Sequence, residues 1–82
     1  MVTAGQMRAA RALIGISQAE LACRAGVSVP TIKRCESEGE NIPIVSSETQ
    51  QRIRSVLEAE GIEFIPENGG GPGVRLAKKT AR

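Results

Sequence analysis

Apolar residues recur at three- and four-residue intervals through much of the first sixty positions, and this spacing predicts helices rather than strands. The first helix is expected from about residue 4 to residue 14. Thr3 can cap its N-terminus, and Gly15 is typical of a helix C-terminus. Its predicted buried face consists of Met7, Ala10, Leu13 and Ile14.

The stretch from residue 17 to residue 36 predicts two more helices joined by a tight turn. Ser17 and Glu20 have the spacing of a capping box, so a helix is expected to begin at Gln18. Gly26 ends that helix, because glycine adopts left-handed backbone angles without a steric penalty. The apolar face of this second helix is predicted to be Leu21, Ala22 and Ala25.

The third helix is expected over about residues 29 to 36. Ser28 can cap it, and Pro30 falls in the first turn, where a missing backbone N–H costs nothing. Ile32 and Cys35 are three residues apart and predict its buried side, while Val27 can fill the inside of the turn. The pattern therefore predicts a helix-turn-helix unit at residues 17–36, whose second helix faces a DNA groove. A simple αα-hairpin that never contacts DNA is the structural alternative.

The sequence SQAELA, followed by an AGVS turn and TIKRCE, resembles the Cro/repressor-type (XRE-type) helix-turn-helix regulators, without a gap from about Arg11 to Glu36. The resemblance implies a mainly α, lambda-repressor-like domain of about four helices. It also implies a structural ion pair between Arg11 and Glu36, which ties the first helix to the end of the third. Gln18 matches a glutamine with which the family clamps the DNA backbone and sometimes bridges to the recognition helix.

A loop and a fourth helix are expected next. Ile42, Ile44 and Val45 are apolar and are predicted to fold under the domain. Ser47 and Gln50 form a second capping-box pattern, and Gly61 marks the end of the helix. The predicted buried face of this helix is Ile53, Val56 and Leu57.

The C-terminal quarter predicts a strand pair. Residues 62–65 (IEFI) and 73–77 (GVRLA) read as short strands, and the proline- and glycine-rich segment between them reads as a turn. An isolated hairpin is barely stable in water, so it must pack on the fourth helix, on a second subunit, or on both. Ile62, Phe64 and Leu76 are the expected apolar anchors and dimerisation residues. The domain boundaries are therefore predicted as a DNA-binding domain at 1–61, strands at 62–77 and a basic tail at 78–82.

Charge is segregated along the 82 residues although the net charge is only +2. Residues 1–34 carry a net +4, residues 35–67 a net −6 and residues 68–82 a net +4. A basic first segment suits phosphate contact, and an acidic middle suits a face turned away from DNA. In the tail, Lys78, Lys79 and Arg82 can be either a solvated end or an arm that touches phosphate.

Composition argues against several other functions. The chain has no histidine, tryptophan or tyrosine, so the commonest general base and metal ligand are missing, as are stacking platforms for single strands. No enzyme activity, metal or cofactor is therefore expected. The two cysteines, Cys23 and Cys35, make no disulfide framework, and no apolar run approaches membrane length. The expected location is a reducing cytoplasm, without a membrane partner.

The predicted mechanism places the third helix in the major groove of double-stranded DNA, with Arg34 directed at a guanine and Lys33 at a guanine or a phosphate. Val29 suits a thymine methyl, and Pro30 adds only van der Waals contact. The expected base-reading residues are Val29, Pro30, Lys33 and Arg34. The expected phosphate contacts are Gln18, Thr31, Arg24 and Arg8.

The expected function is that of a homodimeric repressor or autoregulator on an operator with two half-sites. RNA polymerase is a further candidate partner, through Glu36, Glu38 and Glu40. A protein-interaction module, such as an antitoxin or anti-activator that uses the acidic middle and the strands, is the alternative function.

Overall fold

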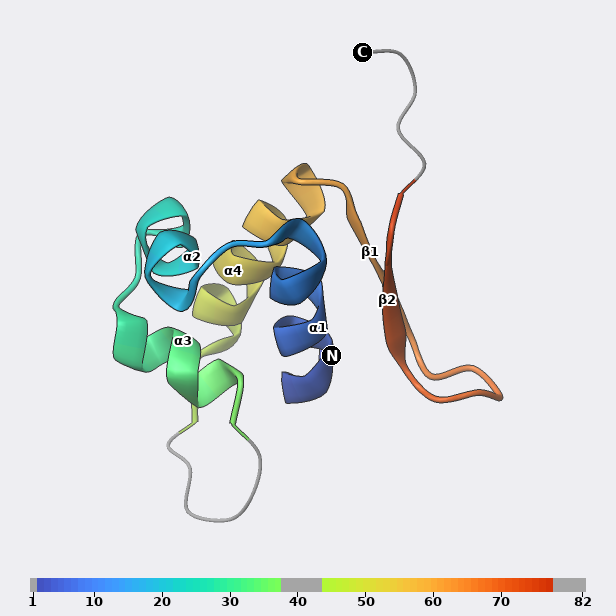
Figure 1. Cartoon of the computed structure of the whole chain (residues 1–82). Helices are drawn as coiled ribbons and strands as arrows, with labels where there is room; N and C mark the ends of the chain where they lie inside the picture. Colours follow the sequence, from blue (N-terminus) through green and yellow to red (C-terminus); the bar gives the residue numbers. More distant parts are fainter. Residues whose placement is uncertain (1, 38–43, 78–82) are drawn as a thin grey trace.

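The computed structural model of the chain describes residues 2–37 and 44–77. In these residues it shows four helices and one antiparallel pair of strands (Figure 1). The elements are α1 (Ala4–Ile14), α2 (Gln18–Ala25), α3 (Val29–Cys35), α4 (Ser47–Ala59), β1 (Ile62–Ile65) and β2 (Gly73–Leu76). The mainly α fold with a C-terminal strand pair, as predicted from the sequence, is confirmed.

The helix ends are formed by the residues that the sequence indicates. Thr3 and Gln6 form a reciprocal capping box, in which the Thr3 N–H donates to Gln6 Oε1 at 2.8 Å and the Gln6 N–H donates to Thr3 Oγ1 at 3.1 Å. Gly15 and Gly26 both adopt left-handed backbone angles, with φ of 72° and 70°. Ser17 and Ser28 cap α2 and α3 through the backbone N–H groups three residues ahead.

The core lies where α1, α2 and α4 meet, and α3 and β1 each add one residue to it. Leu21, Ile32, Ile53 and Leu57 are completely buried. The other buried apolar residues are Met7, Ala10, Ala22, Ala25 and Ile62. Aliphatic side chains from five elements thus build one small core without any buried aromatic ring.

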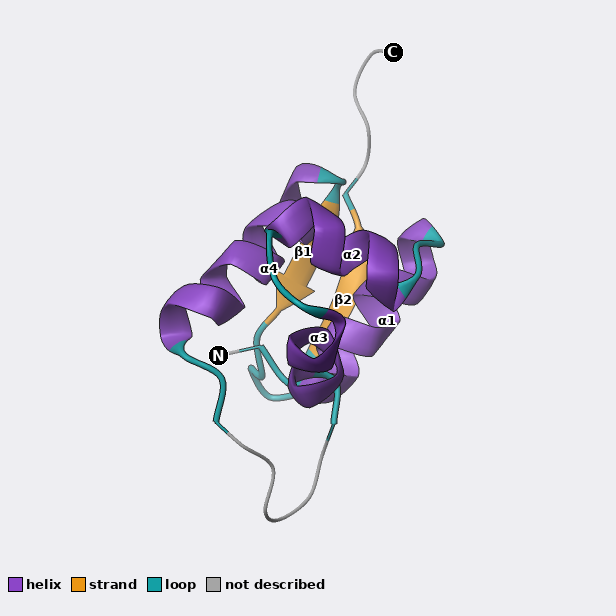
Figure 2. Cartoon of the chain, turned by 90° about the vertical axis from the view of Figure 1, so that its left-hand side faces the viewer, coloured by secondary structure: helices purple, strands orange, loops and turns teal. Residues whose placement is uncertain are grey.

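The hairpin covers the side of the domain opposite to α3. In Figure 2, α3 lies in front and both strands lie behind the other helices. β1 packs against α4 and β2 against α1, with Phe64 opposite Val74 in the register. The buried amide of Gln6 donates from Nε2 to the carbonyl oxygens of Ile65, at 3.1 Å, and Gly73, at 2.9 Å. Gln6 therefore holds together the first turn of α1 and both strands, a role that apolar periodicity could not predict.

Two apolar residues that were predicted to be buried are exposed. Leu13 is 45% exposed, although it lies on the helical face predicted to be buried. Ile44 is 96% exposed. Val45 is half-buried, whereas Ile42 lies outside the described residues, as do Glu38, Glu40 and the tail residues 78–82.

Two capping predictions are also corrected. The N-cap of α4 is Ser46, whose hydroxyl accepts the Thr49 N–H at 3.2 Å, and not Ser47. Gln50 donates instead to the Val45 carbonyl oxygen at 3.0 Å. At the start of α2, Glu20 pairs with Arg24 rather than reaching back to the cap, since the arginine one turn later offers a charged partner.

Candidate nucleic-acid interface

The position of α3 is set by its turn and by its buried side. Gly26 reverses the chain, and the Val27 N–H donates to the Ala22 carbonyl oxygen at 3.0 Å. Ser28 then caps α3, and Pro30 lies in its first turn. Ile32 is completely buried in the core beneath the helix. A seven-residue helix is too short to be stable alone, so these contacts determine both its existence and its tilt.

Glu36, directly after α3, is the centre of a polar cluster that fixes the other end of the helix. Its side chain is 4% exposed. Arg11 donates to both carboxylate oxygens, from Nε at 2.8 Å and from Nη2 at 3.1 Å. Gln18 donates to Oε1 at 3.0 Å, and Arg8 donates to the backbone carbonyl oxygen. The ion pair expected between Arg11 and Glu36 is therefore present, and it links α1, α2 and the end of α3.

The electrostatics of this cluster agree with its geometry. Hydrogen bonding to the Glu36 carboxylate raises the pKa of Arg11, so the guanidinium stays charged at any ordinary pH. Desolvation and the nearby Glu36 charge also raise the pKa of the half-buried Cys35 thiol. Cys35 is therefore held as a neutral, weakly reactive thiol on the buried side of α3.

The outward side of α3 carries the cations that the sequence analysis assigned to base reading. Pro30, Lys33 and Arg34 are exposed. Within residues 2–37 and 44–77, neither Lys33 nor Arg34 forms an ion pair. Val29 differs from the prediction, because it is half-buried and packs against the core. The exposed surface of α3 is thus a short cationic ridge with one proline at its start.

The predicted phosphate contacts are engaged within the protein. Gln18 and Arg8 both bind Glu36, as described above. Arg24 pairs with Glu20 on its own helix and with Glu60 after α4, at 2.8 Å. The Thr31 hydroxyl lies 2.8 Å from the Ser28 hydroxyl in the first turn of α3. Any contact that these side chains make with phosphate must therefore replace or share an existing interaction.

The three predicted dimerisation residues differ in how far they are buried. Ile62 is 3% exposed and belongs to the core of its own chain, so it is not available as an anchor for a second subunit. Phe64 is half-buried, with the Arg54 guanidinium carbon 5.4 Å from its ring centroid. Leu76 is 47% exposed. Sequence alternation could not separate these cases, because it does not reveal that the hairpin folds back on α1 and α4.

Several glutamates in the described part of the acidic middle segment form ion pairs with arginines. Glu58, Glu60 and Glu63 pair with Arg54, Arg24 and Arg75, at 3.0, 2.8 and 2.6 Å. Glu36 is buried, so it cannot belong to an exposed acidic patch. These pairs reduce the acidic surface on which a protein-interaction module would depend.

Two other kinds of site are not found in the described residues. No helix there is both long enough and apolar enough to cross a membrane. In the same residues, no group of three or more cysteine or acidic side chains is arranged to hold a metal ion. Comparison with protein-family models gives no match to this chain, and comparison with curated proteins gives none either.

Proposed function

We propose that this protein binds double-stranded DNA by placing α3 in the major groove and thereby regulates transcription. The observation that carries the proposal is the exposure of Lys33 and Arg34 on one side of α3 while Ile32 and Glu36 hold its other side. A rigidly held helix with free cations on its outer side is suited to meet a groove lined by phosphates and base edges.

The proposed recognition divides the work between two kinds of contact. Arg34 presents a planar fork of donors that matches O6 and N7 of guanine, while Lys33 can reach a guanine or a phosphate. Pro30 contributes shape only. The phosphate contacts around α3 come from Gln18, Thr31, Arg24 and Arg8. Arg8 and Gln18 must then donate to a phosphate as well as to Glu36, or in its place. Few base contacts arise from one such head, so a homodimer on two half-sites is part of the proposal.

The test of base reading is Arg34→Ala, with Arg75→Ala as its control. Arg75 is another exposed arginine, on the hairpin at the opposite side of the domain (Figure 2). Arg34→Ala should weaken binding to the specific site by about 1–3 kcal/mol and relax the preference at one base pair, whereas Arg75→Ala should have little effect. Fluorescence anisotropy on the specific and on random duplexes measures both effects. An equal loss on the two duplexes would show that Arg34 does not read a base.

The duplex for that experiment comes from protection of the DNA upstream of the protein's own gene. Protection of two half-sites about one helical turn apart is expected for a dimer. Salt dependence then separates the proposal from the alternative of a protein-interaction module. Affinity that rests on several phosphate contacts falls steeply with salt, so a flat salt dependence argues for the alternative.

A further inference from the structure

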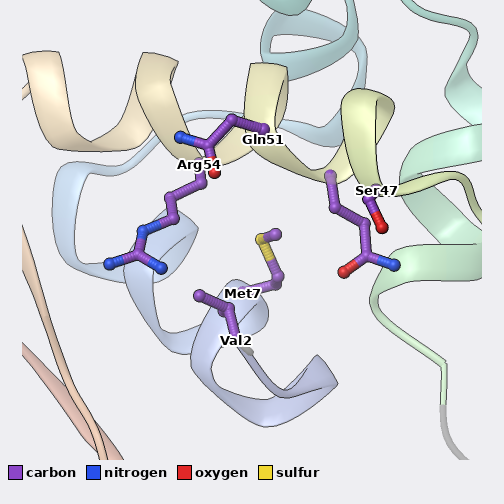
Figure 3. Close-up of a pocket in the computed structure, with 6 residues that line it drawn as sticks. Val2, Met7, Ser47, Gln51 and Arg54 are labelled. Atoms are coloured by element: carbon purple, nitrogen blue, oxygen red, sulfur yellow. The ribbon is translucent and has the colours of Figure 1, made fainter.

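A small hollow lies between the first turns of α1 and the N-terminal half of α4. It has a volume of about 170 Å³. The residues that line it are Val2, Met7, Ser47, Gln50, Gln51 and Arg54. In Figure 3, Arg54 and Gln51 lie on one side of the hollow, Ser47 lies on the other, and the side chain of Met7 points into it from α1.

The lining combines an apolar floor with a polar rim. Met7 is 2% exposed and Val2 is half-buried, so the deepest surface is a thioether and a branched aliphatic chain. Arg54 is the one charged residue among the six that line the hollow. Small-molecule sites commonly pair apolar surface with a few polar groups that fix the orientation of the ligand. Glu58 engages Arg54 through Nε, so the lining favours a ligand that is largely apolar and offers a carboxylate to the other nitrogens of Arg54.

The Arg54 guanidinium is oriented by two neighbouring side chains, and part of its hydrogen-bonding capacity remains available. Its Nε donates to Glu58 Oε2 at 3.0 Å, and its central carbon lies 5.4 Å from the centroid of the Phe64 ring. Its two terminal nitrogens donate to no atom in the described part of the chain. A guanidinium that is already oriented loses little freedom on binding, and its free N–H groups match the oxygens of a carboxylate.

We propose that this hollow, the Arg54 pocket, binds a small organic carboxylate. The apolar part of the ligand would rest on Met7 and Val2, and its carboxylate would accept hydrogen bonds from Arg54. Size sets the class, because a cavity of about 150 Å³ is large enough for a benzene ring. The hollow, with about 170 Å³, has room for such a ring, and we expect the carboxylate on the side of Arg54. The site does not depend on the proposed DNA binding.

The direct test titrates the ¹⁵N-labelled full-length protein with benzoate and, separately, with benzamide, which has nearly the same shape but no charge. Benzoate should give saturable shifts of the amide signals of Met7, Gln51 and Arg54, in the millimolar range. Benzamide should bind at least about tenfold more weakly, which corresponds to a loss of about 1.4 kcal/mol. Shifts that do not saturate, or equal binding of the two compounds, would overturn the proposal.

Variants then locate the charge that is recognised. Arg54→Gln should weaken benzoate binding at least about tenfold. Arg52→Gln is the matched control, because Arg52 belongs to the same helix, is 56% exposed in its side chain and does not line the pocket. Gln51→Glu alters an exposed residue at the rim and should also weaken benzoate, since it adds a competing carboxylate. Benzoate binding that is equal in the Arg54→Gln and Arg52→Gln proteins, or undiminished by Gln51→Glu, would refute the assignment.

Discussion

The helix-turn-helix unit and the C-terminal hairpin are built by different means. In residues 17–36, each turn and each helix start is set by a residue within three or four positions, such as Gly26, Ser17 or Ser28. In the hairpin, the strands depend on a side chain that is 59 and 67 positions away in the sequence, the amide of Gln6. The comparison shows that local residues determine the helices of the proposed DNA-reading unit, and the contacts of Glu36 then fix the position of α3. The position of the hairpin instead depends on its contacts with α1 and α4.

The largest effect is expected from removing the anchor of α3. Glu36→Gln takes the charge from a buried carboxylate that receives hydrogen bonds from Arg11 and Gln18, and should destabilise the domain by about 3 kcal/mol. Glu63→Gln is the control, because its partner Arg75 is well exposed, and it should cost less than about 1 kcal/mol. Urea unfolding measures both. Equal losses of stability would mean that the contacts of the buried Glu36 carboxylate stabilise the domain no more than the surface ion pair of Glu63 does.

The next effect should be confined to the hairpin. Gln6→Ala removes the amide that serves the Ile65 and Gly73 carbonyls and should lower the free energy of hairpin opening by about 1–3 kcal/mol. Hydrogen exchange at the amides of residues 62–65 and 73–76 reports this opening. Unchanged exchange there would show that packing on α1 and α4 holds the strands without Gln6.

A smaller effect separates the two glycine turns. Gly26→Ala places a Cβ on a residue with φ of 70° and should cost about 1–2 kcal/mol. Gly70→Ala, in the hairpin turn, meets no atom within 4 Å and has no left-handed angle, so a change of less than about 0.5 kcal/mol is expected. Thermal unfolding of the two variants provides the comparison. A larger loss at Gly70 than at Gly26 would reverse the roles assigned to the two turns.

The smallest effect concerns thiol reactivity and shows whether the two regions are independent. Cys23 is exposed, whereas Cys35 is half-buried. Desolvation raises the pKa of the Cys35 thiol above its ordinary value, which lowers its thiolate fraction at pH 8. Iodoacetamide should therefore modify Cys23 first, as followed by mass spectrometry of peptides. The slow rate at Cys35 should persist in the Gln6→Ala protein. If that rate rises, loosening the hairpin also loosens the packing around α3.

The success of the sequence predictions follows the same division between local and distant contacts. The caps at Thr3 and Ser28 and the left-handed Gly15 and Gly26 were predicted because each depends on neighbours in the chain. The burial of Leu13 was predicted wrongly, because helical spacing indicates an apolar face but not which of its residues the rest of the chain covers.

For the residues of the candidate site, too, the sequence predicted what local spacing decides and missed what distant contacts decide. Lys33 and Arg34 are exposed as expected, because neither shares the helical face of the buried Ile32. The full set of partners around Glu36 and the use of Ile62 inside its own chain required the packed arrangement. The Arg54 pocket had no sequence signal, because its lining comes from two helices and the residue before the cap of α1.

The order of caps, glycines and apolar positions along the chain by itself determined four helices, one tight turn and two short strands, since these depend on backbone preferences and on neighbours three or four residues away. Only the tertiary structure decided which leucines and isoleucines are covered, where the hairpin docks and which polar groups meet. These outcomes depend on surfaces brought together from distant parts of the chain, and burial is a property of that meeting and not of any single segment.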